Sequence, residues 1–102
     1  MSAPRASLAI AGDTLTISGV LDFETALDLD EPGRHWLHRD APAQCRLDLA
    51  AVDYSSSVGV ALVLGFLRTA LHAGKTLRID NMPEHMAALV RVGGLQELLS
   101  SP

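Results

Sequence analysis

Residues 55–67 constrain the fold of this chain more strongly than any other part of its sequence. They read SSSVGVALVLGFL, so three serines lead into a run from Val58 to Leu67 that has no polar side chain. The run is shorter than the roughly 20 residues that cross a bilayer. A helix that packs on one side of a sheet needs only one apolar stripe. The run therefore predicts a helix over residues 57–73 whose second face is buried, either by flanking helices of the same domain or by another protein.

Three hydroxyl groups lie where this helix would begin, on Ser55, Ser56 and Ser57. We expect at least one of them to cap the helix by accepting a hydrogen bond from a free backbone N–H. Another is available for function, because a phosphoryl group added here would meet the positive end of the helix dipole. Gly59 and Gly65 each cost a helix about 1 kcal/mol relative to Ala. Close approach of another backbone or helix is the expected reason for both glycines.

The remaining elements follow from apolar periodicity and from turn residues. Strands are expected over residues 7–10, 14–19, 46–49 and 76–79, the first two joined as a hairpin, and residues 50–56 are expected to connect a strand to the long helix. A helix over residues 23–38, capped by Asp22, should break or kink near Glu31, because Pro32 removes a helical hydrogen bond, and residues 34–37 should continue as a second short turn. A further helix should open at Pro83 and end at the glycine pair 93–94, with a last helical turn over 95–99.

This order of elements predicts a single α/β domain over residues 1–102. A strand, a crossover helix and a following strand imply parallel pairing within one sheet. The expected architecture is a mixed four-stranded sheet, or five strands if a further short one forms, flanked by about four helices.

Composition narrows the classes of function. Hydrophobic residues make up 48% of the chain and charged residues 20%, as in a folded domain. The net charge is −4 and the basic residues are scattered, so we expect no nucleic-acid partner. Cys45 is the only cysteine, which fits a reducing compartment. The first ten residues contain no secretion signal, so a soluble, cytoplasmic protein is expected.

Few residues suggest catalysis. The chain has no nucleophile elbow, phosphate loop or dinucleotide fingerprint, so we expect neither an enzyme nor a cofactor. His35 and His38 are spaced i,i+3 beside Asp40, but solvated side chains explain this better than a metal site. Trp36 and Tyr54 are large amphipathic rings that could anchor a partner or pack at the rim of the core.

Residues 47–64, LDLAAVDYSSSVGVALVL, resemble the signature of STAS domains, the fold of sulfate transporters and anti-sigma antagonists. The G-x-L-D element at residues 19–22 and the G-L-x-x-L element at 94–98 are similar too. The resemblance implies that Ser57 stands at the family's phosphorylatable Ser or Thr and Gly59 at the motif glycine. Val58 stands where a small residue is common. Ser56 stands where anti-sigma antagonists usually carry Asp, which counts against kinase-driven switching.

Within that family the chain looks closer to the small STAS subunit of Mla-type ABC transporters, which move phospholipid between the membranes of Gram-negative bacteria. This implies a non-enzymatic cytoplasmic subunit that binds the transporter ATPase, supports its assembly and activity, and meets the membrane only through the complex. The alternative is an anti-sigma factor antagonist switched by serine phosphorylation. The residues expected to bind the partner are Ser55, Ser56, Ser57, Tyr54, Val58, Gly59 and Leu62. Without its partner, the apolar surface could pair two copies of the chain.

Overall fold

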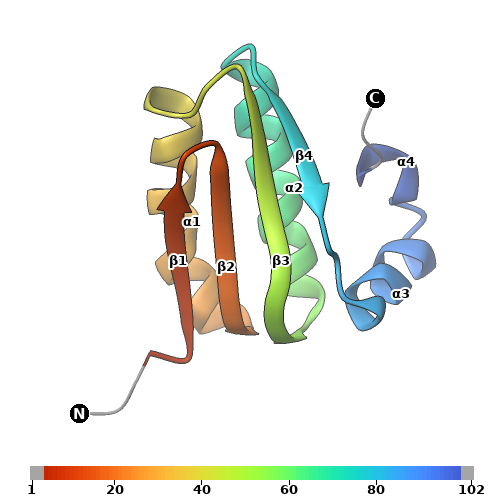
Figure 1. Cartoon of the computed structure of the whole chain (residues 1–102). Helices are drawn as coiled ribbons and strands as arrows, with labels where there is room; N and C mark the ends of the chain where they lie inside the picture. Colours follow the sequence, from red (N-terminus) through yellow and green to blue (C-terminus); the bar gives the residue numbers. More distant parts are fainter. Residues whose placement is uncertain (1–3, 100–102) are drawn as a thin grey trace.

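The computed structural model describes residues 4–99, which form one mixed sheet with helices on one side (Figure 1). The sheet has the strand order β1-β2-β3-β4. β1 and β2 pair antiparallel, whereas β3 pairs parallel to both β2 and β4. The strands are β1 (Ala6–Ala11), β2 (Thr14–Leu21), β3 (Gln44–Ser55) and β4 (Thr76–Asp80). The predicted α/β class and four-stranded mixed sheet are therefore confirmed, and no fifth strand forms within the described residues.

Two long helices cover one face of this sheet, and two shorter ones lie beyond its β4 edge (Figure 1). The helices are α1 (Phe23–Arg39), α2 (Ser57–His72), α3 (Glu84–Val92) and α4 (Gln96–Leu99). No helix of residues 4–99 covers the opposite face, where strand side chains such as Thr16, Asp48 and Arg78 alternate with the buried ones. None of the helices in this range is long and apolar enough to cross a membrane.

The core lies between the sheet and the two long helices. Alternate side chains of β2 and β3 point into it, so Leu15, Ile17 and Leu47 are fully buried. Phe66 of α2 and Met86 of α3 are buried as completely. Both long helices thus bury an apolar face against the sheet, and this burial is the main source of stability.

Of the predicted break or kink near Glu31, the break is wrong, because α1 runs through Pro32 as one helix, and residues 34–37 form no separate turn. Buried residues on both sides of the proline, Leu29 and Trp36, hold one continuous face against the core. Gly33 lies against Phe66 so closely that a Cβ atom at this position would overlap the ring. Pro32 and Asp28 are exposed, so the carbonyl that loses its helical partner faces water. Packing of the helix outweighs the local cost of proline.

The predicted connection over residues 50–56 is also wrong, because β3 continues to Ser55. Ala50 and Ala51 are both exposed, which breaks the alternation that a strand would show in the sequence. β3 carries extra residues relative to β2, because the register between them shifts between Thr16 and Ser18 and again between Gly19 and Val20. Val52 then returns to the core.

Several local predictions are confirmed. Asp22 caps α1, since its side chain accepts a hydrogen bond from the Thr25 N–H at 3.1 Å. Gly74 follows the C-cap of α2 with a φ of 73°, as expected for a helix-ending glycine. Pro83 is the N-cap of α3 rather than its first residue.

Candidate functional site

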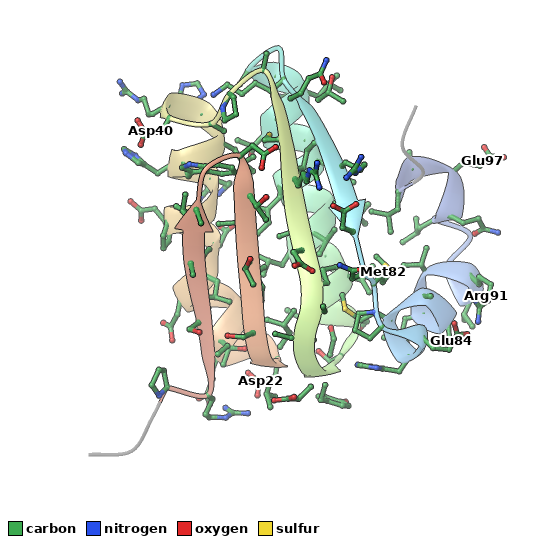
Figure 2. All side chains as sticks on the ribbon, viewed as in Figure 1. Asp22, Asp40, Met82, Glu84, Arg91 and Glu97 are labelled. Atoms are coloured by element: carbon green, nitrogen blue, oxygen red, sulfur yellow. The ribbon has the colours of Figure 1, made fainter. Side chains whose placement is uncertain are left out.

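The site predicted from the serines lies at the edge of the sheet where β2 and β3 end. These strands are parallel, and Leu21 of β2 pairs with Ser55 of β3. The Ser56 N–H donates a hydrogen bond of 2.9 Å to the Leu21 carbonyl. The start of α2 is thereby fixed beside the turn from β2 into α1, at the lower edge in Figure 1, where Figure 2 labels Asp22.

The three serines have different environments. Ser55 is buried, and its hydroxyl donates to the Ser56 carbonyl at 2.9 Å. Ser56 is the N-cap of α2, since its hydroxyl accepts from the Val58 N–H at 3.2 Å, which confirms the predicted capping role for one serine. Ser57 is the first residue of the helix and is exposed, and its hydroxyl has no hydrogen-bond partner in residues 4–99. Ser57 is therefore the serine whose hydroxyl is available to a partner or a modifying enzyme.

Gly59 explains how the helix starts so close to the sheet. A Cβ atom added to it would overlap the Ser55 hydroxyl and would lie 2.9 Å from the Leu21 Cβ. A close approach is found at Gly59, but it is to the side chains of Ser55 and Leu21 rather than to another backbone or helix. The expected close approach is wrong for Gly65, where an added Cβ would meet no atom within 4 Å.

Apolar side chains with exposed surface lie at the same edge of the sheet as Ser57, where β2 and β3 end and α1 and α2 begin. Tyr54 is 54% exposed at the end of β3, and Phe23 is 65% exposed at the first position of α1. Val58 is half-buried. We call Phe23, Tyr54, Ser57 and Val58 the α2-start surface. Sequence reasoning missed Phe23, because its nearness to α2 depends on the pairing of β2 with β3.

Two residues expected at a partner interface lie beneath this surface. Leu62 is only 6% exposed and belongs to the core, and Gly59 is buried as well. The run of apolar residues in α2 is therefore buried largely by its own domain, against the sheet and α1. Ala61 and Ser57 are the exposed positions in its first turns.

His85 of α3 contacts two residues at the end of β3, Ser55 and Tyr54. Its Nε2 atom accepts a hydrogen bond of 2.9 Å from the Ser55 N–H. Its ring stacks on Tyr54, with centroids 6.0 Å apart and an angle of 11° between the planes. The sequence carries no local signal for this contact, because residue 85 lies 30 positions from its hydrogen-bond partner.

The charged side chain at this edge of the sheet that caps a helix is Asp22, the N-cap of α1. Hydrogen bonding to the Thr25 N–H, together with the Arg5 guanidinium, lowers the pKa of Asp22 from its usual value. The first turn of α2 itself carries no acidic side chain. The positive end of its dipole is therefore not neutralised within its own first turn.

The remaining His and Cys side chains of the described range lie apart from this site. Residues 4–99 contain no group of three His, Cys, Asp or Glu side chains that could hold a metal ion. His35 and His38 are both exposed. Burial raises the pKa of the Cys45 thiol, whose Sγ donates to the Thr76 carbonyl at 3.6 Å, so this cysteine is a packing residue.

A mixed sheet with helices on one face, and an exposed serine at the start of the helix that follows the central strand, are the features of a STAS domain. Residues 6–100 match the family described as "Mlab, STAS domain", and the chain belongs to this family. No curated protein matches the chain by sequence.

Solved structures agree with this assignment. A chain of the Acinetobacter MlaFEDB complex in its ATP-bound conformation is 25% identical, with a TM-score of 0.72 over 82% of this chain and 87% of that one. The anti-sigma factor antagonist SpoIIAA in its unphosphorylated form is 19% identical, with a TM-score of 0.69 over 81% of its own length and 88% of this chain. The phosphorylated form of the Bacillus cell fate determinant SpoIIAA is 21% identical, with a TM-score of 0.66 over 90% of this chain and 86% of that one. The fold is thus shared by a transporter subunit and by sigma-pathway regulators.

Proposed function

We propose that this chain is the STAS subunit of an Mla-type phospholipid-transport ABC complex, and that it binds the ATPase of that complex through the α2-start surface. It acts without catalysis, by favouring the assembled and active ATPase. On this proposal the protein is cytoplasmic and meets the inner membrane only through its partner. The match to the MlaB-type family and the likeness to a chain of the MlaFEDB complex support this choice.

The observation that carries the proposal is the composition of the α2-start surface. Ser57 is small and exposed, and the exposed rings of Phe23 and Tyr54 and the half-buried Val58 lie at the same edge of the sheet. Aromatic side chains are enriched at the centre of protein interfaces, where they lose most of their contact with water. A bulky or charged side chain at position 57 would hold a partner away from both rings.

A second candidate is an anti-sigma factor antagonist. The unpartnered Ser57 hydroxyl at a helix N-terminus favours it, because a phosphate there would interact well with the helix dipole. Against it stands Ser56, which fills the N-cap position where antagonists carry Asp. Its hydroxyl caps the helix but supplies no carboxylate beside the acceptor serine.

The deciding experiment is affinity purification of the tagged full chain from its native host, followed by identification of the proteins that accompany it. We expect an ABC ATPase together with its membrane subunit. Recovery of a serine kinase of the anti-sigma type, without the transporter, would contradict the proposal and support the second candidate.

The same experiment with variants tests the surface. We expect Ser57→Arg to abolish recovery of the ATPase, and Ser57→Ala to weaken it only modestly. Thr76→Arg is the matched control, because Thr76 is equally exposed but begins β4 at the opposite end of the sheet. Normal recovery by a folded Ser57→Arg variant, judged by its circular dichroism, would rule out this docking surface.

A further inference from the structure

A second surface, separate from the α2-start surface, lies where the tip of β1 meets the outer side of α1. It is a groove of about 490 Å³. Its apolar lining includes Ile10, which is 46% exposed, and Leu27, which is 62% exposed. Nothing in the proposed function uses this groove, so it needs its own explanation.

The groove is acidic. Asp28, Glu31 and Asp40 line it, and no Lys or Arg does. None of these three carboxylates forms a salt bridge with another residue of the described range 4–99. Figure 2 labels Asp40 at the end of α1, on the side of the molecule away from α3 and α4. An occupant with positive charge would be favoured here.

Trp36 adds a second observation that points to a ligand. The side chain is only 5% exposed, and it lines the groove. Its indole N–H has no acceptor in residues 4–99, yet this nitrogen is not sealed from solvent. The little surface that Trp36 exposes therefore includes its N–H, and because Trp36 lines the groove we infer that this N–H opens into it. A buried indole usually finds an acceptor, so the groove offers a donor that its occupant can satisfy.

The free edge of β1 borders the same groove. The Arg5 carbonyl accepts a hydrogen bond from the Val20 N–H, so by alternation the backbone groups of Ala6, Leu8 and Ile10 face away from β2. No strand of the described chain pairs with that side (Figure 1). β1 reads ASLAIA and has neither the proline nor the charged side chain that usually protects an edge.

We propose that this groove and strand edge together bind an extended basic segment of a partner protein. The segment pairs with β1 as an added strand, since the outward N–H and carbonyl groups of Leu8 and Ile10 supply the hydrogen bonds. Its alternate side chains enter the groove, where Arg or Lys meets the carboxylates of Asp28 and Glu31. An acceptor atom of the segment takes the hydrogen bond from Trp36.

The test uses the full chain labelled with ¹⁵N and a seven-residue acetylated peptide in which Arg and Val alternate. Trp36 is the sole tryptophan, so its indole N–H gives a single assigned resonance. We expect this resonance to shift as the peptide is added, with an affinity that falls as salt rises. A peptide of the same length with Glu in place of Arg should cause no shift.

Two modifications separate the parts of the proposal. Methylating the backbone nitrogens on one edge of the peptide should abolish binding, because strand pairing is lost, whereas methylating the other edge should not. The double variant Asp28→Asn with Glu31→Gln should weaken binding about three- to tenfold. Glu97→Gln on α4 is the matched control and should leave the affinity unchanged (Figure 2).

Three results would overturn the proposal. One is an unchanged Trp36 resonance at saturating peptide. Another is binding that survives methylation of either edge. The third is a resonance that shifts with protein concentration in the absence of peptide, because a second copy of the chain would then occupy the edge.

Discussion

Ser55, Ser56 and Ser57 have the same side chain, and their positions alone give them different roles. Ser55 is buried at the end of β3, Ser56 caps α2, and Ser57 is exposed on the first turn. The sequence predicts that one serine caps the helix, because serine is a preferred residue at helix N-caps. It cannot predict which one, because that depends on where β3 ends.

The two glycines of α2 allow a matched test at this scale. Gly59→Ala should destabilise the fold by about 1–3 kcal/mol, because its Cβ overlaps the Ser55 hydroxyl. Gly65→Ala should instead stabilise it by about 0.5–1 kcal/mol, since a Cβ there meets open space and Ala favours the helix. Urea denaturation of both variants measures the difference. Equal effects of the same sign would mean that the close approach at Gly59 does not limit the helix start.

The surroundings of Ser57 show where sequence reasoning stops. Tyr54 and Val58 could be predicted as interface candidates because they flank the serines in sequence. Phe23 and His85 could not, because they reach the same edge only through the pairing of β2 with β3 and through the packing of α3. Leu62 was expected in the interface and lies in the core, since the helical face it occupies turns toward the sheet.

At the scale of elements, α1 shows a proline tolerated inside a packed helix. Pro32→Ala should stabilise the protein by about 1 kcal/mol. The variant regains a helical hydrogen bond to the Asp28 carbonyl, while losing the restriction that proline imposes on the unfolded chain. Pro42→Ala, in the exposed loop after α1, is the control and should bring no gain. Thermal unfolding of both variants, followed by circular dichroism, would check this, and a destabilised Pro32→Ala would show that the packing of α1 depends on its proline.

The elements that could be predicted are those whose signals are local. The hairpin turn at Gly12, the cap at Asp22 and the helix end at Gly74 each depend on residues within a few positions. α1 and β3 could not be bounded from sequence, because the packing of Gly33 on Phe66 and the exposed pair Ala50–Ala51 are consequences of the whole sheet. Local preference yields to tertiary packing at both places.

At the scale of the whole molecule, a carboxylate on the uncovered face of the sheet makes the stability of the fold depend on pH. The Ala50 N–H and the Asn81 amide donate to the Asp48 carboxylate at 3.0 and 3.1 Å. These hydrogen bonds lower the pKa of Asp48 in the folded protein. The unfolded value is about 3.9, so the stabilisation is present above this pH and is lost as the pH falls through the lower, folded pKa.

This predicts a difference in acid sensitivity. The urea midpoint of the wild-type protein should fall more steeply below about pH 4 than that of Asp48→Asn, whose side chain has no proton to gain. Asp53→Asn is the control, because Asp53 is exposed and its carboxylate makes no hydrogen bond within residues 4–99, and its curve should follow the wild type. Parallel curves for all three proteins would show that the hydrogen bonds of Asp48 do not contribute.

The fixed start of α2 has a consequence for the rates at which a partner would bind and dissociate. Ser56 is fixed by its hydrogen bond to the Leu21 carbonyl and by the cap that its hydroxyl forms. Gly59 has no room for a side chain, and the Tyr54 ring stacks on His85. A partner that docks there meets a rigid shape and has little to reorganise on this side. Substitutions on the α2-start surface should then change mainly the dissociation rate of a complex and much less its association rate.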